Sequence, residues 1–197
     1  MGLDSIELLF FVEDTFSIRF NASEAEQINT VQDFSNSVYD KIVTKPNKEC
    51  VSHKIFKRFK ESIQRLKLSD IVVMPETKLS ELFPNENLHR NWKLLETDIG
   101  LQLPELSSLD FSPKLSSHVS VLGVKIKKRS KPVLNGNVQQ LIDWVISLNY
   151  NKLINIKEIT SKYEVERIIC GIIYDRMGVR INEIELEHSI TYDLGID

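Results

Sequence analysis

The chain has 197 residues, a length typical of one large domain or two small ones. Hydrophobic residues make up 42% of it, which is ordinary for a globular protein with a core of its own. A net charge of −3 lacks the basic excess of a nucleic-acid-binding domain, and no apolar run approaches the roughly 18 residues that a transmembrane helix needs.

The first helix is predicted over residues 3–16, because apolar residues recur there at helical spacing. Its predicted apolar stripe consists of Leu3, Ile6, Leu9, Phe10, Val12 and Phe16. A short acidic helix is expected around residues 24–27. Thr30 then predicts the start of a third helix, because Asp33 follows three residues later as the acidic partner of a capping box.

Residues 43–51 predict a linker, since Pro46 and its polar neighbours interrupt the helical pattern. Two helices are expected beyond it, over 52–68 and 86–99, and Gly100 ends the second. The first of these helices has a basic side made of Lys54, Lys57, Arg58, Lys60 and Arg65.

The stretch 107–136 predicts a short β-hairpin or an ordered loop, with a basic run from Lys125 to Lys131. Asn137 is a suitable N-cap for a helix that continues to Leu148. The last long helix is expected over residues 159–177 and ends at Gly178.

The two ends of the chain resemble the two halves of an acyl carrier protein. Residues 6–16, IELLFFVEDTF, resemble the second helix of that family with its VELV..LEEEF pattern, and the spacing is kept through Thr30. Residues 164–177 resemble the first helix, and residues 179–189 resemble the loop after it. Residues 193–197, DLGID, resemble the DLG.D that precedes the attachment serine of the family.

This resemblance implies a circularly permuted carrier, opened at the attachment point. The expected fold is all-α, with an acyl-carrier-protein-like four-helix bundle formed by residues 1–44 and 158–197. A second helical domain, residues 51–154, is inserted between them. The alternative to one shared bundle is a domain-swapped homodimer, in which a neighbouring chain supplies the helix at 159–177.

The inserted domain shows weaker parallels that suggest a degenerate carrier-like repeat. Residues 95–104 parallel 12–21, and residues 137–141 parallel 30–34. Residues 75–82 parallel the loop before the attachment point, which places Asn85 where a serine would stand.

In carrier proteins the serine after DLG.D receives a 4′-phosphopantetheine arm, and it lies fourteen residues before the phenylalanine that closes the second helix. Counting back from Phe16 leads to Gly2, whereas Ser5 is only eleven residues away. We therefore expect no arm and no other cofactor. The alternative is a functional carrier modified on Ser5, which needs a three-residue deletion and rotates the helix by about 300°.

The resemblance implies a non-catalytic partner of fatty-acid or polyketide biosynthesis enzymes, a role based on protein–protein interaction. The residues expected to meet basic docking patches on such enzymes are the acids Asp4, Glu7, Glu13, Asp14 and Glu26. An unrelated helical adaptor, or an enzyme whose site the sequence hides, is the remaining alternative.

Several residue types exclude other chemistries. Cys50 and Cys170 lie far apart and match no metal-ligand spacing, and the four histidines are scattered, so that we expect no metal site. No Ser-His-Asp, Cys-His or paired-carboxylate pattern is present, so that no enzymatic activity is expected. Residues 1–7 carry acids and no basic residue, unlike a signal peptide. Both thiols are expected to be free, which predicts a protein of the reducing cytoplasm.

Overall fold

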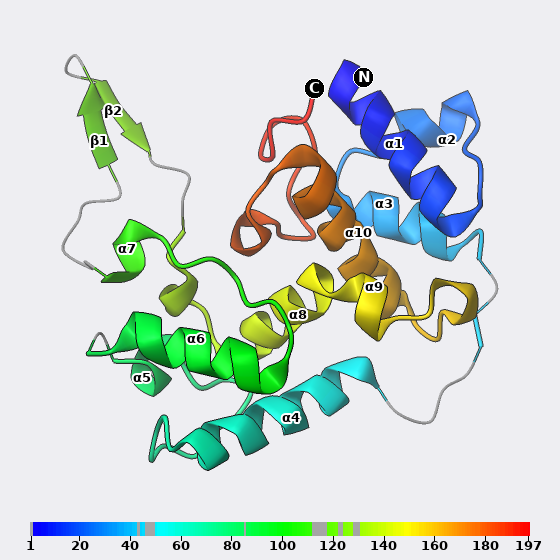
Figure 1. Ribbon diagram of the computed structural model, residues 1–197. Helices are drawn as coiled ribbons and strands as arrows, with labels where there is room; N and C mark the ends of the chain where they lie inside the picture. Colours follow the sequence, from blue (N-terminus) through cyan, green and yellow to red (C-terminus); the bar gives the residue numbers. More distant parts are fainter. Residues whose placement is uncertain are drawn as a thin grey trace. The chain divides into compact units, whose positions relative to one another are not determined.

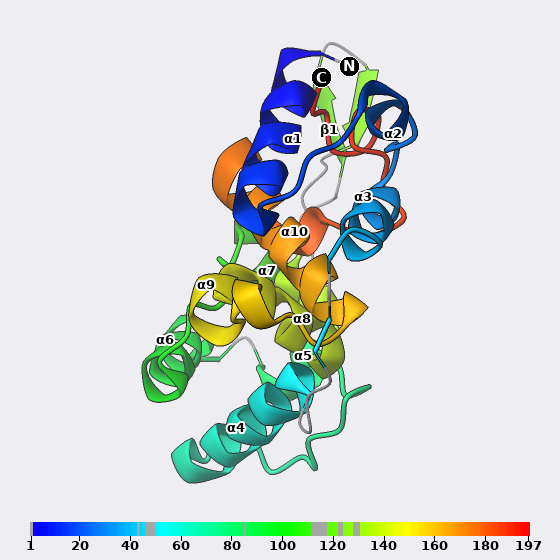
Figure 2. The same ribbon diagram turned by 90° about the vertical axis from the view of Figure 1, so that its right-hand side faces the viewer.

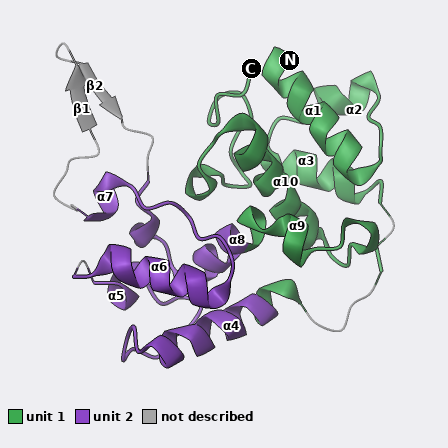
Figure 3. Cartoon of the chain, in the orientation of Figure 1, with its two compact units in different colours: residues 1–53, 146–197 green, residues 54–145 purple. Residues whose placement is uncertain are grey.

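The computed structural model describes most of the chain, namely residues 2–42, 44–45, 50–84, 86–111, 118–121, 124–127 and 131–197. Pro46, Asn85 and residues 128–130 of the basic run lie outside the described residues. The described chain is mostly helical, which confirms the predicted class (Figure 1). It divides into two compact units, unit 1 (residues 1–53 and 146–197) and unit 2 (residues 54–145), which Figure 3 colours separately.

Unit 1 combines helices from both ends of the chain. In chain order its elements are α1 (Leu3–Phe16), α2 (Ala22–Glu26), α3 (Val31–Tyr39), α9 (Tyr150–Leu153), η2 (Ile156–Glu158), α10 (Lys162–Met177) and η3 (Ile181–Glu183). Helix α10 packs against both α1 and α3, as the views in Figures 1 and 2 show. The predicted helix over 3–16 is confirmed, and the one over 159–177 begins three residues late because Ser161 is its N-cap.

Unit 2 is built from the middle of the chain. Its elements, two of which run across the unit boundary, are α4 (Val51–Leu66), α5 (Leu79–Leu82), α6 (Leu88–Ile99), α7 (Ser108–Phe111), β1 (His118–Val121), β2 (Val124–Lys127), η1 (Val133–Asn135) and α8 (Val138–Leu148). Strands β1 and β2 pair antiparallel, with Val119 opposite Ile126, so that the hairpin alternative for this segment is confirmed. Gly100 ends α6 in the left-handed conformation, as predicted.

The predicted boundaries of the inserted domain, 51–154, need correction. Residues 146–154 belong to unit 1, together with α9. The physical reason lies at Gly171 of α10, where a Cβ atom would overlap the backbone oxygen of Ser147 and the ring of Tyr150. The absence of a side chain at this glycine lets the end of α8 and the start of α9 approach α10 directly.

The predicted apolar stripe of α1 also needs correction. Leu3, Ile6 and Phe10 are exposed, with 80%, 39% and 62% of their surface accessible. The residues that α1 buries are Ser5, Leu8, Val12, Glu13 and Phe16. Because α1 carries apolar residues on two sides, its periodicity alone does not say which side meets α10.

The beginning and the end of the described chain meet at the first turn of α1. The backbone oxygen of Asp197 accepts hydrogen bonds from the backbone N–H groups of Asp4, at 2.6 Å, and Ser5, at 3.0 Å. Leu194 and Ile196, just before it, are buried. Residue 197 therefore supplies a partner for N–H groups that the first turn of a helix leaves without an intrahelical acceptor.

In each unit the start of a helix, α3 or α8, is joined to a distant loop by the same pattern of backbone hydrogen bonds. In unit 1 the bonds run from Val31 N to His188 O (3.1 Å), from Gln32 N to Leu186 O (2.7 Å) and from Ile190 N to Asn29 O (2.9 Å). In unit 2 they run from Val138 N to Thr77 O (2.9 Å), from Gln139 N to Pro75 O (2.8 Å) and from Leu79 N to Gly136 O (3.0 Å). The two sets have identical register along both segments.

Helix caps recur between the units in the same places. The helices α3 and α8 both open with a capping box, made by Thr30 and Asp33 in one and by Asn137 and Gln140 in the other. The helices α10 and α4 are each 16 residues long, and a residue with positive φ follows each of them. The parallel between sequence segments thus extends to the backbone geometry of the two units.

A glutamate near the end of α1 and of α6 performs the same task in both units. Glu13 Oε1 accepts the backbone N–H of Phe20 at 2.6 Å, and Glu96 Oε1 accepts that of Leu103 at 3.0 Å. In each case the acceptor and the donor lie seven residues apart. This hydrogen bond holds the segment after the helix against the last turn of that helix.

Asp110 joins the chain before β1 to the chain after β2. Its carboxylate is buried and accepts the N–H and the hydroxyl of Ser107 and the N–H of Leu134, each at 2.8 Å. We expect Asp110→Ala to lower the free energy of unfolding by about 3 kcal/mol, because it leaves buried donors without an acceptor. Urea denaturation measures this loss.

Asp110→Asn retains one carbonyl oxygen and should lose less stability than Asp110→Ala. Glu105→Ala is the control, since Glu105 is an exposed acid five residues earlier and should change stability little. Equal stability of Asp110→Ala and Glu105→Ala would contradict a structural role for the Asp110 carboxylate.

Candidate functional site

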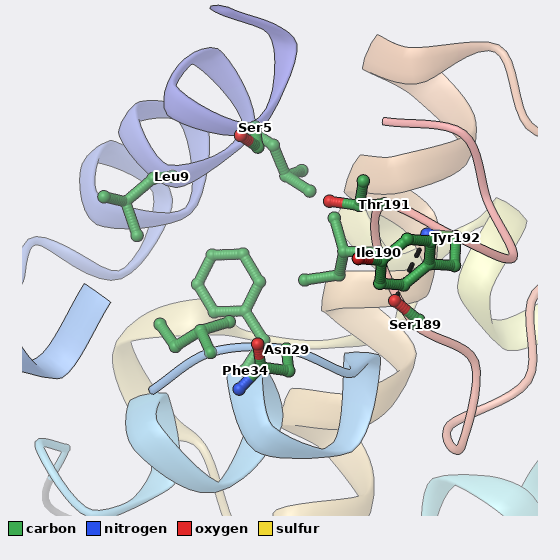
Figure 4. A pocket seen from close by; sticks show the side chains of 10 residues that line it. Ser5, Leu9, Asn29, Phe34, Ser189, Ile190, Thr191 and Tyr192 are labelled. Carbon is green, nitrogen blue, oxygen red and sulfur yellow. Dashed lines mark hydrogen bonds between the residues drawn. The ribbon is translucent and has the colours of Figure 1, made fainter. Parts of the chain in front are cut away.

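A cavity of about 190 Å³ lies in unit 1 beside the first turns of α1. Its apolar wall consists of Leu8, Leu9, Ile28, Phe34 and Ile190, and its polar rim of Ser5, Asn29, Ser189, Thr191 and Tyr192. Figure 4 shows side chains from α1, from the start of α3 and from the loop at 189–192 around one space. Segments from both ends of the chain therefore form one cavity.

The hydroxyl groups of the rim take part in local turns. Ser5 Oγ donates to the backbone oxygen of Gly2 at 3.0 Å, and Thr191 Oγ1 donates to that of Ile196 at 3.3 Å. Ser189 Oγ accepts the backbone N–H of Tyr192 at 3.2 Å, the dashed line in Figure 4. These bonds order the rim and leave the apolar wall as the main contact surface for a ligand.

The side chains that line this cavity suit apolar contact better than acid–base chemistry. They include no carboxylate, imidazole, amine or thiol, and their one titratable group is the phenol of Tyr192. The volume is below the roughly 300 Å³ at which pockets for drug-sized molecules begin. Within the described part of the chain, no group of three histidine, cysteine or acidic side chains is placed to hold a metal ion.

Gly2 stands immediately before α1, at the position that the family resemblance assigns to the attachment serine. Its backbone is extended, with φ −82° and ψ −172°. A Cβ atom built on Gly2 would overlap the carbonyl carbon of Asp197 and lie 2.7 Å from its oxygen. The close approach of these two backbones leaves no room for a side chain at residue 2.

Ser5, the alternative attachment residue, lies on the inner side of α1 and is 7% exposed. Its hydroxyl is bonded within the first helical turn, to Gly2. The backbone N–H groups of Asp4 and Ser5 already donate to Asp197, so that they are not free to receive a phosphate at this helix terminus.

The acids expected to bind a partner divide into two groups. Asp4, Glu7, Asp14 and Glu26 are exposed. Glu13 is 4% exposed and its predicted place on the acidic surface is wrong, because its carboxylate accepts the N–H of Phe20 inside the unit. The recurrence of a glutamate seven residues before an apolar residue, as in Glu96 and Leu103, was the available sequence signal for this internal role.

One side of α1 is an exposed surface of apolar and acidic residues, here called the α1 face, which the sequence did not predict. Its members share one side of the helix at spacings of 3, 4, 7 and 11 residues from the first, and they are Leu3, Ile6, Glu7, Phe10 and Asp14. The error arose because these apolar residues were expected to face the core.

Comparison with known proteins adds no family or fold assignment. No protein-family model, no curated protein and no solved structure matches the chain. None of the helices in the described ranges has the length and hydropathy that crossing a membrane requires.

The contact between Gly2 and Asp197 can be tested by adding a side chain. We expect Gly2→Ser to lower the free energy of unfolding by about 1–3 kcal/mol, because its Cβ displaces the backbone of Asp197 from the first turn of α1. Thermal and urea denaturation measure the change. Glu7→Ser is the control, since it places a serine at an exposed position of the same helix. A Gly2→Ser protein as stable as this control would show that residue 2 accommodates a side chain.

Proposed function

We propose that unit 1 is an acyl-carrier-like docking module that binds basic patches on enzymes of fatty-acid or polyketide assembly and carries no phosphopantetheine arm. The observation that carries this proposal is the exposed α1 face, which combines apolar and acidic side chains.

The α1 face has the composition of a protein-binding surface. Leu3 and Phe10 leave most of their apolar surface in water, where burial against a partner would contribute roughly 1.5–3 kcal/mol per side chain. Helix α1 contains four acids and no basic residue. A partner that presents an apolar groove flanked by lysine or arginine would match both features, and the charges would mainly increase the association rate.

The arrangement of helices supports a carrier-like bundle. Helix α10, the loop 178–197, α1, α2 and α3 occur in the order that the family resemblance implies, once the chain is followed from residue 197 to residue 2. The hydrogen bonds from Asp4 and Ser5 to Asp197 join these segments at the expected attachment point. This is consistent with a permuted carrier, in which termini that lie close together tolerate a new opening.

The absence of an arm is supported at both candidate residues. Gly2 has no side chain and no room for one, and Ser5 has a buried hydroxyl that already donates to a backbone oxygen. A phosphopantetheinyl transferase needs an accessible hydroxyl as nucleophile. The competing proposal of a carrier modified on Ser5 is favoured by residues 4–7, DSIE, which mimic the attachment motif, and by the position of Ser5 in the first turn of α1 and at the rim of the cavity.

Intact-mass measurement separates these two proposals. We expect the mass of the full chain to stay unchanged after co-expression with a phosphopantetheinyl transferase, because no accessible hydroxyl stands at the attachment point. A gain of about 340 Da, the mass of the arm, would overturn the armless assignment. If Ser5→Ala then abolished that gain, the chain would be a functional carrier. A conventional carrier protein in the same cells confirms that the transferase is active.

Docking through the α1 face is tested with Phe10→Ala. Calorimetric titration of the full chain against a panel of purified condensing enzymes from fatty-acid and polyketide assembly should detect binding. Loss of the Phe10 ring should weaken that binding roughly 10- to 100-fold. Leu94→Ala is the matched control, because Leu94 is an exposed apolar residue on α6 of unit 2. An unchanged affinity for Phe10→Ala, or no binding by any enzyme of the panel, would contradict the proposal.

A further inference from the structure

Unit 2 exposes a strongly basic helix surface, here called the α4 face. Between residues 54 and 67 the chain carries six basic side chains and one acid. The members that share one side of α4 are Lys54, Lys57, Arg58, Glu61 and Arg65, and all five are exposed. Arg65 is paired with Asp98 of α6 through two hydrogen bonds, of 3.1 and 2.5 Å, and the face still carries three further basic side chains against one acid.

The corresponding side of α10 in unit 1 has the opposite character. Because α4 and α10 have equal length and each is followed by a residue with positive φ, residue 54 corresponds to 165, and residues 57, 58 and 61 to 168, 169 and 172. These α10 residues are Val165, Ile168, Ile169 and Ile172, and all are buried. A helix side that serves as core in unit 1 is therefore an exposed, charged surface in unit 2.

Apolar side chains accompany this basic surface. The segment that follows α4 exposes Ile71 (44%), Val72 (71%) and Met74 (46%), while Val73 between them is buried. Exposed apolar residues gathered in one segment favour contact with another protein. Unit 2 thus combines positive charge with apolar surface, and the α1 face of unit 1 combines negative charge with apolar surface.

From this complementarity we infer that the α4 face of one copy of the chain binds the α1 face of a second copy. The five members of the α1 face and the five members of the α4 face have the same spacings, namely 3, 4, 7 and 11 residues from the first. Each face therefore extends about 16 Å along its helix. Glu7 and Asp14, the two acids of the α1 face, lie about two turns apart and can then meet basic side chains of the α4 face.

This contact is heterologous, because it joins two different surfaces. It therefore produces head-to-tail oligomers, which either close into rings or continue as open chains. The inference goes beyond the proposed docking of enzymes, although both use the α1 face, so that self-association and enzyme binding would compete. Variants of the α4 face test the inference separately, since they leave the α1 face intact.

Sedimentation equilibrium of the full chain tests self-association. We expect oligomers that dissociate on dilution and that weaken at least tenfold when the salt concentration rises from 50 to 500 mM, because the screening length then falls from about 14 Å to about 4 Å. The double variant Lys57→Glu/Arg58→Glu and the double variant Glu7→Lys/Asp14→Lys should each be monomeric. Circular dichroism checks that both remain helical, which their exposed positions favour.

A mixture of the two double variants provides the sharpest outcome. Neither associates alone, because each carries like charges on both faces, but an equimolar mixture should form complexes in which acidic faces meet basic ones. The control Lys152→Glu/Lys157→Glu lowers the net charge by as much as Lys57→Glu/Arg58→Glu does, but at exposed positions of unit 1. It should associate like the parent chain.

Three results would overturn the inference. They are a parent chain that is monomeric at millimolar concentration and low salt, an α4-face variant that associates as well as the parent, and a mixture that stays monomeric. The proposed docking of enzymes is tested independently of these results. The α4-face variant retains Leu3, Phe10 and the neighbouring acids, so its affinity for an enzyme that binds the parent chain should be unchanged.

Discussion

The packing of α10 against α1 and α3 is the interaction on which unit 1 depends. It brings α10 together with helices that begin about 160 residues (α1) and 130 residues (α3) earlier in the sequence, so its formation carries the loop-closure cost of the intervening chain. The hydrogen bonds from Asp4 and Ser5 to Asp197 complete this joint at the first turn of α1. The same unit contains the cavity, the close approach of Gly2 to Asp197 and the exposed α1 face.

The two units show how one backbone scaffold can carry different surfaces. The hydrogen bonds between helix and distant loop, the capping boxes and the glutamate acceptors recur in both. They satisfy backbone groups and so constrain the path of the chain, whatever the side chains elsewhere. The side of α10 that is core in unit 1 corresponds to a charged, exposed side of α4 in unit 2. A shared scaffold is therefore compatible with opposite charge on the two proposed binding surfaces, and it does not by itself assign a function.

Local features of the fold were predictable because they depend on neighbouring residues. The helix over 3–16, the Thr30–Asp33 capping box and the end of α6 at Gly100 follow from patterns that span a few residues, whereas the segment of β1 and β2 was left open between a hairpin and a loop. The candidate site was less accessible to such reasoning. The partner of Glu13 is a backbone N–H seven residues ahead, and nothing in the amphipathic pattern of α1 distinguishes this internal acid from the exposed Asp14.

The sequence by itself determined where most helices begin and end, that the chain is mainly helical, and which residue types are available at the start of α1. Tertiary structure alone decided that Leu3, Ile6 and Phe10 face solvent while Ser5 and Glu13 are buried. It also decided that the backbone of residue 197 occupies the space beside Gly2. The physical reason is that helix boundaries depend on caps and turns within a few residues, whereas the buried side of a helix is chosen by partners that the chain supplies from distant segments.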